Sequence, residues 1–120
     1  MNLSNYQHIA PEYLYEISGN DPEFIKEIIE TFAANTPEDL LAIDVALLQR
    51  DWLSLQNACH KTKASAKFLG AISLGNLMAD LEEYCKQPDL DVALVQQKVA
   101  HAKAIYDMVI KDLEHLCSAL

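Results

Sequence analysis

Apolar residues recur at alternating steps of three and four along the last third of the chain. This spacing gathers them on one narrow stripe of a helix, which suits packing along neighbouring helices at a shallow angle. The rest of the chain has no convincing alternation of apolar and polar residues and only three glycines, so β-strands have little support. We therefore predict an all-α protein. The stripe consists of Val92, Val95, Val99, Ala102, Tyr106, Val109, Leu113 and Leu116.

Start and stop signals divide the chain into helices. The motifs "NDPEF" and "NTPEDLL" each place a capping side chain, Asp21 or Thr36, before a proline at the first helical position. We expect separate helices to begin at these motifs, the second running to about Arg50, and Asp51 to cap the next. The first is expected to bury Phe24, Ile25, Ile28, Ile29 and Phe32, and the second Leu40, Leu41, Leu47 and Leu48.

The remaining helices are expected at about 11–18, 51–69, 73–85 and 92–116. Short connections force neighbouring long helices to run in opposite directions. The prediction is an antiparallel four-helix bundle with one or two additional short N-terminal helices. Residues 1–10 form an N-terminal segment in this interpretation, and residues 11–120 form a single domain.

Charge and hydropathy exclude several classes of function. The formal net charge of −9 argues against nucleic acid, because binding to phosphates depends on positive charge. No apolar run is long enough to span a membrane, and the N-terminus lacks the pattern of a secretion signal. We expect a cytoplasmic protein, and a monomer as the simplest state. The cysteines are predicted to be reduced, because their spacing does not form CxxC pairs; they are Cys59, Cys85 and Cys117.

The stretch "ACHKTKASAKFLGA", residues 58–71, carries three of the nine basic residues around one histidine. On a helical wheel His60 points directly away from the apolar side, and no acidic residue occurs from Trp52 to Ala79. The stretch therefore predicts an exposed imidazole in a locally positive region, although a solvated polar face has the same pattern. The outward face also holds Gln56, Lys63, Ala64 and Lys67, with Lys61 further round.

The other histidines do not suggest a metal site. His8 precedes the predicted domain, while His101 and His115 lie off the stripe of the last helix, so we expect all three to be solvent-exposed bystanders. Metal sites in bundles need a Glu-x-x-His pair turned inward, whereas Glu114 directly precedes His115. No bound metal is predicted.

The histidine stretch resembles the histidine-containing phosphotransfer (HPt) domains of bacterial multistep phosphorelays. Their helix has the form A-x-H-x-L-K-G-S-S/A-x-x-L-G-A, followed by L-x-x-[small]-x-x-L-E. Two positions depart from this pattern: Thr62 replaces a buried leucine, and Ala64 replaces a glycine and narrows the docking space by one methyl group. The matching positions are Ala58, His60, Lys63, Ser65, Ala66, Leu69, Gly70 and Ala71, then Leu74 or Leu77, Met78, Leu81 and Glu82.

The resemblance implies a role for each residue around the histidine. His60 would carry a phosphoryl group between receiver-domain aspartates, and Glu82 would hydrogen-bond the other ring nitrogen and fix its tautomer. Lys63 would attract the phosphoryl oxygens. Lys67 would meet the acidic rim of the partner, Lys61 would add general attraction, and Gln56 would contact the phosphate or the partner. Leu53 and Phe68 are expected either to be docking contacts or, equally, to belong to the core.

The resemblance also implies the partners. These are response-regulator receiver domains, which hold the Mg²⁺ ion, and a hybrid sensor histidine kinase. The chain itself shows no nucleotide-binding motif, so we expect a phosphoryl carrier without a cofactor rather than an enzyme. Two alternatives stay open: a helical adaptor that binds a receiver domain without carrying phosphate, and a purely structural interaction module.

Overall fold

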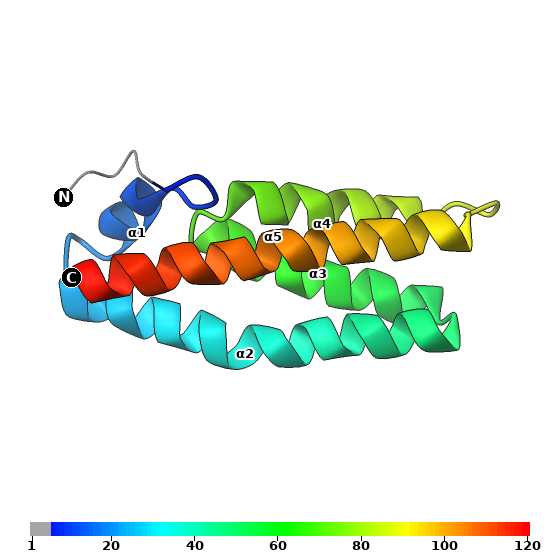
Figure 1. Ribbon diagram of the computed structural model, residues 1–120, viewed down its shortest axis with the longest axis horizontal. Helices are drawn as coiled ribbons and strands as arrows, with labels where there is room; N and C mark the ends of the chain where they lie inside the picture. The colour runs from blue at the N-terminus through cyan, green and yellow to red at the C-terminus, as the bar shows by residue number, and fades with distance from the viewer. Residues whose placement is uncertain (1–5) are drawn as a thin grey trace.

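A computed structural model describes residues 6–120, which form a helical bundle 47 Å long (Figure 1). The helices are α1 (Pro11–Ile17), α2 (Pro22–Gln49), α3 (Trp52–Phe68), α4 (Ile72–Tyr84) and α5 (Val92–Ala119). Helices α3 and α5 each pack mainly against α2 and α4, so they occupy opposite corners of the bundle. The predicted all-α four-helix bundle with a short N-terminal helix is thereby confirmed.

Helix α2 is continuous where two helices were predicted. Asp21 caps it as expected, accepting hydrogen bonds from the backbone of Glu23 and Phe24, but Pro37 lies inside the helix. Helices commonly kink at an internal proline, and α2 bends near its middle (Figure 1). The predicted start at Thr36 was therefore wrong.

The environment of Thr36 explains why no helix begins there. The side chain is buried, and its Oγ1 donates a hydrogen bond to the Phe32 carbonyl at 2.6 Å. Oγ1 also lies 2.7 Å from the Tyr106 hydroxyl of α5, which must donate because the threonine proton is already used. A hydroxyl satisfied in this way inside the bundle is not available as a helix cap.

Several side chains of α2 that were predicted to be buried face solvent instead. Phe24, Leu41 and Leu48 are exposed, contrary to expectation, because they lie outside the stripe of the helix that faces the core. The buried stripe of α2 is Ile25, Ile29, Phe32, Thr36, Asp39, Leu40, Ile43 and Ala46. The predicted stripe of α5 is buried from Val95 to Leu116, with Val92 partly exposed.

Part of the predicted N-terminal segment packs on the bundle. Ile9 is buried, and the Ala10 N–H donates to the Gly70 carbonyl at 2.9 Å. His8 is half-buried rather than exposed, and its backbone N–H donates to Asp112. Gly70 has a φ of +85°, and a Cβ there would lie 2.7 Å from the Ala10 oxygen. Glycine is therefore required where the segment crosses the α3–α4 turn.

The cysteines described as reduced from the sequence are free thiols in the structure. Cys59 and Cys85 are buried, whereas Cys117 is only partly so. Burial raises the pKa of the Cys59 thiol to about 12, so this thiol stays protonated and unreactive at neutral pH. Among residues 6–120, no helix is both long and apolar enough to cross a membrane.

Candidate functional site

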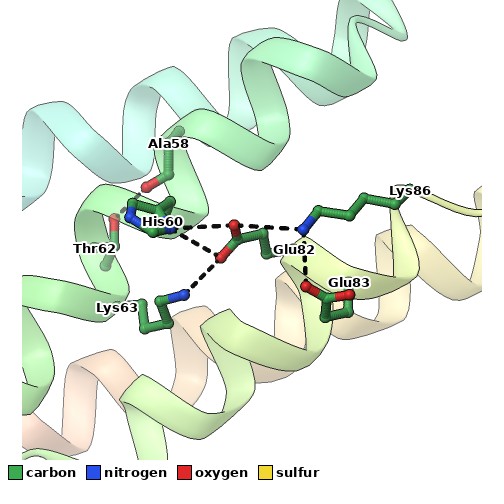
Figure 2. A network of polar contacts seen from close by, with 7 residues as sticks. All are labelled: Ala58, His60, Thr62, Lys63, Glu82, Glu83 and Lys86. Atoms are coloured by element: carbon green, nitrogen blue, oxygen red, sulfur yellow. Dashed lines mark hydrogen bonds and ion pairs between the residues drawn. The ribbon is translucent and has the colours of Figure 1, made fainter.

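Helix α3 holds His60 on its outward face. The opposite side of the helix is anchored in the core by Leu55, Cys59, Thr62 and Ala66. Thr62, at the position where the pattern has leucine, satisfies its hydroxyl by donating to the Ala58 carbonyl at 2.9 Å (Figure 2). With the buried side fixed in this way, the side chain of His60 is 65% exposed.

Glu82 of α4 lies against His60 and joins the two helices. Its carboxylate oxygens are 3.2 and 3.4 Å from His60 Nδ1, and Oε1 accepts a hydrogen bond from Lys63 Nζ at 2.9 Å (Figure 2). The Glu82 side chain is only 12% exposed. The hydrogen bond from Lys63, followed by that from His60, lowers the pKa of Glu82 against the opposing effect of desolvation. The group is therefore a carboxylate at neutral pH.

This contact fixes the protonation pattern of the neutral imidazole. A carboxylate only accepts hydrogen bonds, so the proton of a neutral His60 ring belongs on Nδ1. Nε2 then carries the free lone pair, and no residue within 6–120 hydrogen-bonds to it. An exposed Nε2 lone pair on a ring held by a mostly shielded carboxylate is the arrangement of a nucleophile with an orienting group.

Lysine ammonium groups complete the cluster around Glu82. Lys63 is half-buried against Glu82, so its charge lies one helical turn from His60. Lys86, which sequence reasoning missed, has its Nζ 4.0 Å from Glu82 and 2.8 Å from Glu83 (Figure 2). Its position four residues after Glu82 is the spacing of an ion pair along a helix, and this signal was available in the sequence.

Two of the other residues expected near the partner make contacts within the protein. Lys61 pairs with Asp39 of α2 at 3.0 Å, and the Asp39 side chain is only 6% exposed. Gln56 Nε2 donates to the Cys85 carbonyl at the end of α4. Lys61 thus neutralises a buried acid, and Gln56 helps to fix α3 against α4. Ala64 and Lys67 remain exposed on the face of His60.

A groove of about 490 Å³ lies between α2 and α3, one turn from His60. Ala64 and Phe68 of α3 line it together with Phe24 and Ile28 of α2. Phe24 is 46% exposed and Phe68 is 58% exposed, so the groove presents aromatic surface beside the imidazole. Within residues 6–120, no three His, Cys, Asp or Glu side chains gather in a way that would hold a metal ion.

Comparison with known proteins identifies the family. The sequence matches the family model described as "Hpt domain" over residues 27–120. This match spans most of the chain and includes His60, Lys63 and Glu82, so the protein belongs to the Hpt domain family, as the histidine stretch predicted. Hpt domains are phosphocarriers of two-component systems rather than kinases. No curated protein and no solved structure matches the chain.

The lowered pKa of Glu82 predicts a pH-dependent contribution to stability. The carboxylate stabilises the fold above its usual pKa of 4.5, and this contribution is lost as the pH falls through the lowered value. We expect Glu82→Gln to reduce the free energy of unfolding by about 1 kcal/mol at pH 7. The difference from wild type should become smaller in acid.

Urea unfolding at pH 7 and at pH 3 measures this difference. Glu83→Gln is the matched control, because it removes a neighbouring carboxylate that is exposed and should change stability little. The assignment of the cluster would be contradicted by a Glu82→Gln variant whose difference from wild type is the same at both pH values.

Proposed function

We propose that the protein relays phosphoryl groups between the aspartates of receiver domains through a phosphohistidine at His60. Family membership supports histidine phosphotransfer in a two-component pathway. The observation that carries the residue assignment is the His60–Glu82 contact, which turns Nδ1 toward a mostly shielded carboxylate and leaves Nε2 free on the surface.

The proposed step is a transfer from oxygen to nitrogen. The Nε2 lone pair attacks the phosphorus of an aspartyl phosphate, the N–P bond forms, the P–O bond breaks, and the aspartate leaves as a carboxylate. The ring keeps its Nδ1 proton and becomes positively charged. Glu82 stabilises that charge because it is ionised and lies 3.2 Å from Nδ1. Attack by the aspartate of a second receiver reverses the step.

The lysines of the cluster are proposed to balance the charge of the phosphoryl group. A phosphoryl group on Nε2 adds negative charge and strong acceptor oxygens. Lys63 and Lys86 already lie around Glu82, so their ammonium groups can share contacts between the carboxylate and the new oxygens. We assign Lys63 the closer role, since it is one turn from His60 on the same helix.

The outer face of α3 is proposed as the docking surface for the receiver. Ala64 leaves space beside the imidazole, and the groove lined by Phe24 and Phe68 offers apolar area next to it. Gln56 and Lys61 border this face, although their side chains are also used within the protein. The contact area would therefore combine apolar docking with a rim of polar side chains.

Phosphate would originate from a hybrid sensor histidine kinase and reach response-regulator receivers, and the Mg²⁺ ion would belong to the receiver. The chain needs no cofactor of its own in this scheme. We propose a cytoplasmic monomer, because a carrier must be visited by two partners in turn.

Substitution of His60 tests the proposed function. A receiver domain phosphorylated with acetyl phosphate should label the wild-type protein with acid-labile, alkali-stable phosphate. His60→Gln should abolish labelling and leave the fold unchanged, because the side chain lies outside the core. His101→Gln, which removes an exposed histidine of α5, should be labelled normally. Intact receiver binding without labelling of the wild type would instead identify a receiver-binding adaptor.

Substitution of Ala64 tests the docking surface. Ala64→Leu places a branched side chain in the space beside His60 on an exposed position of α3, where leucine favours the helix. We expect labelling by the receiver to fall at least tenfold while thermal unfolding is unchanged. Ala64→Gly, which widens the space, should keep labelling. Normal transfer to the leucine variant would mean that the receiver approaches from another side.

A further inference from the structure

The lysines of this acidic protein divide into paired and unpaired groups. Within residues 6–120, a carboxylate oxygen lies within 4.0 Å of the ammonium group in Lys26, Lys61, Lys63, Lys86, Lys98 and Lys103. Lys67 and Lys111 have no such partner. The chain has twice as many acidic as basic residues, 18 against 9, so a lysine left without an acid is an exception.

The side chain of Lys67 lies against Gly75 of α4. Gly75 is buried within α4, and a Cβ at that position would lie 2.6 Å from Lys67 Cγ and 3.1 Å from Cε. Glycine inside a helix is less stable than alanine, so the sequence gives up helix stability here. Because Gly75 has no Cβ, the aliphatic part of the Lys67 side chain can lie directly against helix α4.

The Lys67 side chain shares the surface of the candidate site. Lys67 is seven residues after His60 on the same outward face of α3, which places the two Cα atoms about 10 Å apart. No acidic residue occurs between Trp52 and Ala79 that would neutralise it within this part of the sequence. A protein large enough to cover His60 therefore also covers an exposed, unpaired positive charge.

We propose that Lys67 is a specificity-determining residue, which pairs with a carboxylate of the receiver domain docked over His60 and is positioned for this by Gly75. The inference rests on the proposed phosphotransfer and adds to it the residue that selects among receivers. Charge complementarity at the rim of an interface acts mainly on association and on partner choice. Lys67 should therefore affect KM rather than the transfer step.

The test compares the two unpaired lysines. Transfer is followed from the receiver that labels the wild type fastest, phosphorylated with acetyl phosphate, at several NaCl concentrations. We expect Lys67→Glu to raise KM at least tenfold at low salt, to weaken the salt dependence, and to leave kcat within twofold. Lys111→Glu makes the same change in net charge on α5, at the opposite corner of the bundle, and should leave KM within twofold.

Two further experiments separate the effect of the position of the Lys67 ammonium group from the effect of its charge. Gly75→Ala keeps the ammonium group of Lys67 but adds a methyl group where the Lys67 side chain lies. The side chain must then move, so KM should rise several-fold without loss of thermal stability. Reversing one acidic residue of the receiver to lysine should restore transfer to Lys67→Glu, and a set of such reversals locates the partner carboxylate.

The outcomes distinguish this inference from the proposed function. Equal KM values for Lys67→Glu and Lys111→Glu, with wild-type protein labelled normally, would reject the role of Lys67 alone. Failure of every receiver of the source organism to label the wild type would reject the phosphotransfer proposal, and the selection of receivers by Lys67 with it.

Discussion

A single carboxylate shared between two helices governs the geometry of the candidate site. Glu82 belongs to α4, yet its closest contacts are with Lys63 and His60 of α3. These contacts depend on close packing of the two helices, whose facing sides bury small and apolar residues such as Cys59, Ala66, Met78 and Leu81. The carboxylate is mostly shielded, and its pKa is lowered by the lysine and the histidine. The orientation of an exposed imidazole is therefore set by a group that is itself held in the bundle.

The positive region around His60 is less uniform than the sequence suggests. Lys61 is paired with the buried Asp39, and Lys63 is paired with Glu82, so both charges are already balanced by carboxylates of the same protein. Lys67 is the exception, since it has no acidic partner among the described residues and lies on a glycine of α4. Three neighbouring lysines thus have three different environments. These environments are set by the packing of α3 against α2 and α4. Lys61 and Lys63 pair with acids of the bundle, whereas the ammonium group of Lys67 is available to another protein.

Much of the fold follows from periodicity, whereas the finer contacts do not. The stripe of α5 and the outward direction of His60 are consequences of helical geometry, so the sequence alone predicts both. The Thr36–Pro37 motif led to the wrong prediction of a helix start. A threonine before a proline can cap a helix, but it can also lie inside one with its hydroxyl buried, as Thr36 does in its hydrogen bonds with Phe32 and Tyr106. That choice depends on a residue seventy positions away. The role of Gln56 was equally hard to predict, because its hydrogen bond to the Cys85 carbonyl depends on how α3 packs against α4.

The most direct test of the central claim is the tautomer of His60, read from the ¹⁵N chemical shifts and long-range ¹H–¹⁵N couplings of its ring at a pH where the ring is neutral. The contact with Glu82 predicts a proton on Nδ1 and a free lone pair on Nε2, and a shift toward the mixture of tautomers typical of exposed histidines in Glu82→Ala. A wild-type ring protonated mainly on Nε2, or a tautomer unaffected by loss of the carboxylate, would contradict the claim that Glu82 prepares His60 for phosphoryl transfer.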